Sequence, residues 1–234
     1  MSFVHEEGKL PSWVPGPPPW AGPGGRSGQT PGPGTRDGDT DEEEPTENVD
    51  ENEDGNVTNL VYKLLENGIK IQNPPASYSV NPSNEFGMDN AAMISEVKAA
   101  FETWDNQTSV ELFDDTVSMT TKSGFINDDG ENVISFAPLD GAVGKTELMF
   151  ENDRVIEFDI VLNSNLSWGI DPDETSYDVQ NVMTHEAGHT LVLQDINDDD
   201  YAHLTMYDES EKGSTVKTSL ENGDIAGLHE LYGE

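Results

Sequence analysis

Two histidines four residues apart, His185 and His189, place the tightest constraint on how this chain can fold. On an α-helix of 3.6 residues per turn such a pair lies on one face, so both imidazoles can reach a single cation. Glu186 directly follows the first histidine. A carboxylate at that place can take a proton from water, which a zinc ion makes more acidic. The stretch therefore predicts a helix that carries a hydrolytic metal site.

The helix offers only two of the three protein ligands that a catalytic zinc site needs. Asp195 stands six residues after His189, past the expected end of the helix, and can supply a carboxylate oxygen as the third ligand. His203 is the substitute if Asp195 is misplaced. The acidic run 198–200 is interpreted as a solvated loop, with a calcium site as an alternative that nothing else in the sequence supports.

The stretch from His185 to Tyr207 resembles the extended metzincin motif HExxHxxGxxH/D with its methionine turn. The three ligands, the general base and the methionine of that motif are matched by His185, His189, Asp195, Glu186 and Met206. An aspartate as third ligand is the snapalysin variant. The single tyrosine after the methionine and the ending GDIAGLHELYG resemble matrixins and their archaeal relatives instead. The resemblance covers roughly residues 74–233.

One position departs from this pattern. Where the family has a glycine, which lets the helix stop in a left-handed turn, this chain has Val192. A non-glycine residue in that conformation costs about 1–2 kcal/mol, and a β-branched one more. Structural zinc sites contribute roughly 10–16 kcal/mol. We therefore expect the metal to hold Asp195 in place despite the strain, and Val192→Gly to raise zinc affinity and thermal stability modestly.

The remaining patterns indicate one long helix, several strands and two further helix boundaries. A helix with Asp89 or Asn90 as its cap is predicted by an apolar stripe of Met93, Val97, Ala100, Phe101 and Trp104. Strands are predicted at Tyr78–Val80, Val110–Thr120, Val133–Phe136, Thr146–Phe150 and Val155–Leu162. Thr175 and Asp178 resemble a capping box before the histidine helix, and Thr218–Leu231 predicts a closing helix.

These elements predict an α/β fold, called α+β in some schemes. The resemblance implies the metzincin catalytic domain: a twisted, five-stranded, mostly parallel sheet with one antiparallel edge strand, a backing helix, the active-site helix, the methionine turn and a C-terminal helix. It places Thr146–Phe150 as the edge strand, to which an extended substrate adds through main-chain hydrogen bonds. The substrate-binding candidates are Thr146, Leu148, Phe150 and Tyr207, with Val182 and His189 beside Tyr207 in the wall of the specificity pocket.

Composition divides the chain into three parts. Residues 1–56 are rich in glycine and proline and then in acidic residues, which predicts a disordered tail. Residues 57–73 are an uncertain linker or the remnant of a prosegment. Residues 74–234 are predicted to form the one globular domain, the metzincin-like zinc protease.

Charge and residue usage exclude several classes of partner. The chain has 47 acidic and 11 basic residues, a formal net charge of −36, which argues against binding nucleic acid or anionic membranes. No apolar stretch is long enough for membrane insertion, and a monomer is expected. The absence of cysteine excludes disulfides, thiolate metal sites and the cysteine switch of matrixin propeptides.

The cellular location is predicted only through the resemblance. The first ten residues lack the apolar core of a signal peptide. Metzincins usually act outside the cell, so an extracellular location is expected, with the cytoplasm as the alternative. The charge and the scarcity of lysine suggest surroundings rich in salt, that is, a halophilic protein.

The function predicted from these residues is that of a zinc-dependent metalloendopeptidase that cleaves extended polypeptides, with Glu186 as the general base. The alternative is a silent metzincin-fold module that only binds peptides because Val192 has spoiled the third ligand. The presence of Glu186 favours the enzyme, since a binding module has no chemical need for a carboxylate beside two zinc ligands.

Salt should stabilise this chain. Residues 57–234 hold 34 acidic and 8 basic residues, a net charge of −26, and added salt screens their mutual repulsion. We expect the melting temperature to rise by several degrees between about 0.1 and 1 M KCl. KCl is the right salt because sulfate also strengthens apolar burial. A melting temperature that is flat over this range would contradict the expectation.

Overall fold

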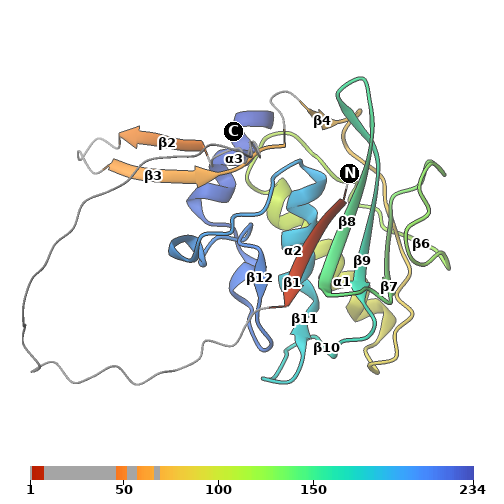
Figure 1. The fold of residues 1–234 in the computed structure, drawn as a ribbon. Helices are drawn as coiled ribbons and strands as arrows, with labels where there is room; N and C mark the ends of the chain where they lie inside the picture. The colour runs from red at the N-terminus through yellow and green to blue at the C-terminus, as the bar shows by residue number, and fades with distance from the viewer. Residues whose placement is uncertain (1, 8–45, 52–56, 66–68) are drawn as a thin grey trace, which may run out of the picture.

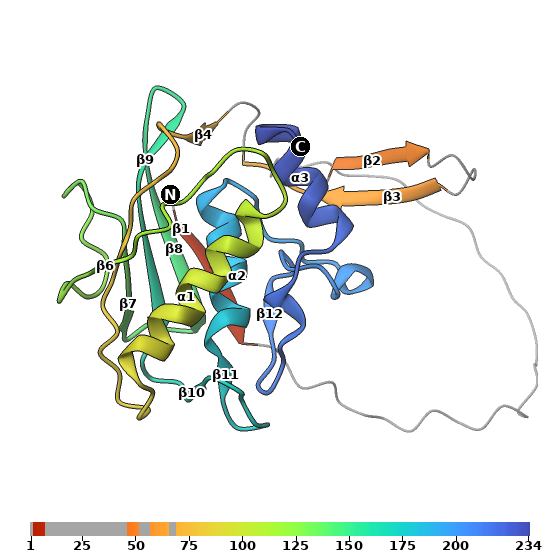
Figure 2. The same ribbon diagram turned by 180° about the vertical axis from the view of Figure 1, so that it is seen from behind.

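A twisted sheet with helices packed on one face forms the body of the protein. The computed structural model describes residues 2–7, 46–51, 57–65 and 69–234. Helices α1 (Asn90–Asp105) and α2 (Val179–Thr190) lie side by side on the same face of the sheet (Figures 1 and 2). Helix α3 (Asn222–Tyr232) lies beyond them and packs against β3 (Val57–Tyr62). The predicted α/β fold is confirmed.

The main sheet has the strand order β12-β1-β8-β9-β7-β5-β6, and β4 pairs with β9. Its strands are β1 (Ser2–Glu7), β4 (Lys70–Ile71), β5 (Ser79–Val80), β6 (Ser118–Met119), β7 (Val133–Ala137), β8 (Ala142–Glu151), β9 (Arg154–Asn163) and β12 (Glu209–Ser210). Strands β9, β7, β5 and β6 are parallel and β8 is antiparallel to β9, which matches the five predicted strands.

Shorter elements complete the fold around this sheet. Strand β10 (Trp168–Gly169) pairs with β11 (Tyr177–Asp178), and β2 (Thr46–Glu51) forms a hairpin with β3. Two 3₁₀ turns, η1 (Asp199–Tyr201) and η2 (Val216–Thr218), lie between α2 and α3. Within the described ranges no helix is long and apolar enough to cross a membrane.

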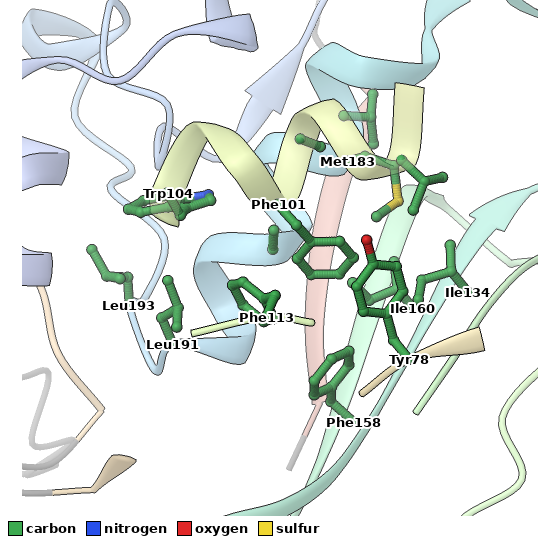
Figure 3. Packing of buried hydrophobic residues seen from close by; sticks show 14 of the residues in the cluster. Tyr78, Phe101, Trp104, Phe113, Ile134, Phe158, Ile160, Met183, Leu191 and Leu193 are labelled. Carbon is green, nitrogen blue, oxygen red and sulfur yellow. The ribbon is translucent and has the colours of Figure 1, made fainter. Parts of the chain in front are cut away.

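The core fills the space between the two long helices and the sheet (Figure 3). Helix α1 buries the stripe that its spacing predicts: Met93, Val97, Ala100, Phe101 and Trp104. Asp89 caps it by accepting hydrogen bonds from the N–H groups of residues 91 and 92. Phe101 lies at the centre of an aromatic group, with ring centroids 4.5 Å from Tyr78 and 4.4 Å from Phe113. This packing fixes α1 as a firm support for α2.

Two of the local predictions are wrong in extent. In the predicted strand Val110–Thr120 only β6 is a strand, because Leu112 and Phe113 are buried consecutively instead of alternating. The closing helix begins at Asn222 and not at Thr218. Residues 216–218 form η2, and the mutual capping of Glu221 and Asp224 starts the helix proper.

The cap of α2 also differs from the predicted box. Asp178 alone is the N-cap, and it accepts a 2.7 Å hydrogen bond from the N–H of Asn181. Thr175 bonds to Asp173 instead, in the preceding turn. The likeness to a capping box therefore located the start of the helix but assigned Thr175 a role that it does not have.

The boundary between tail and domain lies earlier than predicted. Residues 2–7 and 46–51, which composition placed in a disordered tail, are strands, while the rest of the range 1–56 lies outside the described residues. Val61 and Tyr62 are buried against α3, where Gly223 and Gly227 allow a close approach. Residues before position 74 thus belong to the core, a long-range contact that composition does not reveal.

The antiparallel strand is not at the edge of the sheet in this chain. It was predicted as the exposed edge, but β1 pairs along the outer side of β8 from residue 2 to residue 6. In Figure 1 the strand β1 crosses over α2 between β8 and β12. The N-terminal segment therefore covers the edge that a substrate was expected to use.

Candidate metal centre

The two histidines of α2 and Asp195 bring three ligand atoms together. The Nε2 atoms of His185 and His189 are 3.1 Å apart. Oδ1 of Asp195 lies 3.2 Å from the first and 3.3 Å from the second. Ligands at about 2.0–2.1 Å from a tetrahedral zinc ion lie about 3.3 Å from one another. These atoms therefore have the spacing of three zinc ligands, and no other group of this kind occurs among the described residues.

Backbone carbonyls fix the orientation of both imidazoles. Nδ1 of His185 lies 2.7 Å from the carbonyl of Thr205, and Nδ1 of His189 lies 2.8 Å from the carbonyl of Leu193. Because a carbonyl only accepts hydrogen bonds, each Nδ1 carries the proton and each Nε2 keeps its lone pair. This is the tautomer that metal-binding histidines adopt.

The donor set fits a cation on electrostatic grounds as well. Two Nε2 atoms and a carboxylate oxygen face one another at close range, and Oδ1 of Asp195 is buried without a hydrogen-bond donor. Burial and the charge of Lys217 lower the pKa of His185 to about 3, so this imidazole is neutral.

The chain reaches Asp195 through the left-handed turn that Val192 was expected to hinder. Val192 has φ 64°, the conformation of the usual glycine. Its N–H bonds to the carbonyl of His189, and the N–H of Leu193 bonds to that of Gly188, which together form a Schellman motif. The same turn places the carbonyl of Leu193 beneath the ring of His189. The chain therefore adopts the left-handed turn despite the strain at Val192, and the carboxylate of Asp195 lies next to the two histidines.

Met206 packs directly against α2 beneath the histidines. A Cβ on Gly188 would collide with its sulfur and would lie 2.7 Å from the ring of Trp104, so only glycine fits there. Trp104 also donates a 2.8 Å hydrogen bond to the carbonyl of Thr184 on α2. The turn that contains Met206 is joined to the segment that contains Asp195, because the N–H of Ile196 donates a hydrogen bond to the carbonyl of Met206.

Asp224 on α3 holds this turn in place, and no sequence pattern had singled it out for that role. Its two carboxylate oxygens accept the N–H groups of Thr205 and Met206 at 2.9 and 3.0 Å. It is 1% exposed, and burial raises its pKa. Since the carbonyl of Thr205 orients His185, Asp224 supports a ligand from 39 positions away along the chain. Only its place within the predicted closing helix was visible in the sequence.

Glu186 is fully buried beside the three ligand atoms. Its Oε2 accepts a 2.6 Å hydrogen bond from the hydroxyl of Thr146 on β8, and its Oε1 has no donor among the described residues. Burial raises the pKa of Glu186 to about 7. A carboxylate with one oxygen held and the other available is suited to move a proton near neutral pH.

Lys217 is a buried cation next to the site that the sequence reasoning missed. Its Nζ lies 3.4 Å from Nδ1 of His185 and donates a hydrogen bond to the carbonyl of Tyr207. Burial lowers the pKa of Lys217 to about 7, against the opposing effect of Asp195 and Asp224. Nothing in the sequence around Lys217 indicated that this lysine would be buried next to the two histidines.

The remaining candidates lie around this centre in different ways. Thr146 and Leu148 are buried, so what β8 offers a peptide is its main chain and not these side chains. Phe150 is partly buried. The hydroxyl of Tyr207 donates to Asp199 at 2.8 Å. His203 is exposed and outside the cluster, and in the acidic run Asp198 caps η1.

Comparison with known proteins agrees with this fold and site. The matrixin family of peptidases, peptidase M10, matches residues 70–233, so the chain belongs to that family. Matrixins are zinc metalloproteases. The chain is also 32% identical over 146 residues to Metalloendoproteinase 1-MMP of Arabidopsis thaliana. The matched part is 58% of this chain and 36% of that relative, so the chain spans about a third of its length.

The strain at Val192 can be measured with two variants. Val192 is 0% exposed, so Val192→Gly loses apolar burial as well as strain, and the stabilisation expected from the sequence is offset. Val192→Ala loses most of the same burial but keeps a Cβ in the left-handed turn. We expect the free energy of unfolding, measured by denaturant titration, to be about 1 kcal/mol higher for Val192→Gly than for Val192→Ala. An alanine variant equal to or more stable than the glycine variant would contradict the left-handed turn.

Replacing Asp224 should disturb the turn and the metal site together. The substitution Asp224→Asn keeps one acceptor oxygen but turns an NH₂ group toward N–H donors, which costs about 1–3 kcal/mol of the free energy of unfolding. Zinc affinity should fall as well, measured by competition with a chelating dye. Glu230→Gln, which changes an exposed carboxylate on the same helix, is the matched control and should change neither quantity. Equal stability of both variants would refute the role of Asp224.

Proposed function

We propose that this chain is a zinc-dependent metalloendopeptidase that cleaves polypeptides bound in an extended conformation. One observation carries the proposal: three ligand atoms with the spacing of a zinc site lie beside a buried carboxylate that is held by one oxygen. Membership of the matrixin family and the relative that is named a metalloendoproteinase support it.

In this proposal His185, His189 and Asp195 hold the zinc ion. When bound, zinc supplies a Lewis acid for the scissile carbonyl and lowers the pKa of water in the site to about 7. Met206 and Trp104 keep the histidine face of α2 in position from below. The backbone carbonyls of Thr205 and Leu193 keep each Nε2 lone pair directed at the ion.

Glu186 is the proposed general base and then the general acid. It takes a proton from water as the water oxygen forms a bond to the scissile carbonyl carbon, and later gives that proton to the amide nitrogen. The peptide C–N bond then breaks, and the products are a carboxylic acid and an amine. Thr146 fixes one oxygen of Glu186 through its hydroxyl, which leaves the other oxygen for this proton. Polypeptide substrates would lie against the main chain of β8.

We favour the enzyme over the alternative of a silent binding module. That alternative depended on Val192 preventing the turn to Asp195, and the turn is formed with φ 64° at that residue. The buried and hydrogen-bonded Glu186 also supports the enzyme. Calcium has no supporting cluster in the part of the chain that the structure describes.

Glu186→Gln separates the base from the ligands. The variant keeps the size of the side chain but cannot accept the proton, so kcat should fall by roughly 10²–10⁴. Zinc content should stay near one per chain, measured by atomic absorption, because the ligands are other residues. Chelation should abolish cleavage of unfolded casein by the parent chain, and added zinc should restore it.

Thr146→Val is the matched comparison, since it removes only the hydrogen bond to Glu186. Loss of a hydrogen bond to a charged group costs about 1.5–3 kcal/mol, so we expect a smaller fall in kcat of roughly ten- to a hundredfold. Full activity of Glu186→Gln, or cleavage by metal-free protein, would refute the proposed chemistry.

A further inference from the structure

The N-terminal strand β1 is paired with main chain on both of its sides. Along one side it runs antiparallel to β8, from Ser2 opposite Glu147 to Glu6 opposite Ala142. Along the other side it runs parallel to β12, with Glu6 opposite Glu209. Figure 1 shows β1 as the red strand between β8 and β12, which we call the two walls of the groove. A single extended segment therefore bridges β8 and β12.

The first wall, β8, brings β1 over the proposed catalytic carboxylate. His5 is the register partner of Gly144. A Cβ at Gly144 would collide with Oε1 of Glu186 and would lie 3.0 Å from Val182, so the β8 backbone lies directly against both side chains. The backbone of β1 near His5 is thus paired with a sheet position that lies directly against Glu186.

The second wall, β12, follows the turn of the metal centre. It starts two residues after Tyr207. The carbonyl of Tyr207 accepts a hydrogen bond from Lys217, and Tyr207 forms a β-bridge with Ile196. The pairing of β12 with β1 involves only residues 6 and 7. The segment therefore leaves the site along β12 just after it has passed Glu186.

The regular ladder breaks at this crossing. Between His5 and Glu6 the register jumps from Gly144 to Ala142, so that one residue of β8, Val143, has no partner in β1. An irregularity of this kind bends a strand locally. The break lies at the level of Glu186, the place where a bound polypeptide would present a peptide bond to the proposed chemistry.

We infer that residues 2–7 are an intramolecular ligand of the substrate groove, which compete with polypeptide substrates for β8 and β12. The inference rests on the proposed function for the meaning of the groove. The occupant is held by main-chain pairing, as an added strand, so that a substrate of any sequence must displace it. It also defines the direction of binding: antiparallel to β8 and parallel to β12.

This arrangement needs no thiol. The chain contains no cysteine, so a thiolate cannot cover the metal, whereas backbone pairing is open to any sequence. The occupant belongs to the same chain as the domain, and an intramolecular ligand acts at an effective concentration that does not change with the concentration of the protein. The inhibition should therefore not depend on protein concentration.

A pair of prolines tests the pairing in the full chain. Phe3→Pro with Val4→Pro removes two consecutive N–H groups, so at least one ladder bond is lost whichever residues form it. Ser27→Pro with Gly28→Pro adds the same residues to the Pro- and Gly-rich stretch and is the matched control. With a fluorogenic peptide, the first variant should lower KM roughly tenfold at unchanged kcat, as expected when an occupant that fills about 90% of the molecules is removed.

Hydrogen exchange gives a readout that does not need catalysis. In the Glu186→Gln background, those amides of residues 142–147 that point toward β1 should exchange roughly tenfold faster in the Phe3/Val4 proline variant than in the control, whereas those that bond to β9 should not change. If no variant cleaves peptides but this protection is lost, the occupant is real and the proposed function fails.

Three results would overturn the inference. One is unchanged protection of residues 142–147 in the Phe3/Val4 variant. Another is lost protection with an unchanged KM in active protein, which would mean that the segment does not compete. The third is rapid removal of residues 2–7 by the active chain itself, seen by intact mass, which would make the segment a substrate and not a resident ligand.

Discussion

Three ligand atoms that face one another lie 3.1–3.3 Å apart: the Nε2 atoms of His185 and His189 and Oδ1 of Asp195. Much of the structure serves to keep them there. Such an arrangement is repulsive unless a cation lies between the atoms. Two features hold the atoms together against this repulsion. A backbone carbonyl accepts a hydrogen bond from each Nδ1, and the Schellman turn brings the chain back so that Asp195 lies beside the histidines. The free energy of metal binding can then stabilise the folded state.

Support for this centre passes through a column of packed residues. Trp104 on α1 bonds to the backbone of α2, Gly188 admits both Trp104 and Met206, and Asp224 on α3 holds the N–H group of Met206. Trp104 joins α1 to α2, Met206 joins its turn to α2, and Asp224 joins α3 to that turn. The ligands therefore depend on the correct assembly of all three helices, and a site of this accuracy could not form on α2 alone.

The sequence predicted the features that are local. Helical spacing predicted the buried stripe of α1 and the two histidines on one face, because each depends on neighbours within two turns. The resemblance to the metzincin motif predicted the left-handed position of Val192. The sequence did not predict Asp224, Lys217 or the pairing of β1, which depend on residues far away in the chain. Composition even misled for residues 2–7, since pairing with β8 orders a segment that has no pattern of its own. The extracellular location, the monomeric state and the salt requirement stay predictions.

The charges at the site explain why Lys217 is buried there. Burying an ammonium group costs several kcal/mol unless opposite charges lie close by. Here Asp195 stands where many relatives of the motif have a neutral histidine, so the site holds one more negative charge, and Glu186, Asp208 and Asp224 add to the field that favours the charged lysine. With two carboxylates beside a divalent ion the centre would be neutral, and the protonated form of Lys217 would add one positive charge to it. Asp195 and the buried Lys217 are therefore complementary, because the carboxylate favours the charged form of a lysine that burial disfavours.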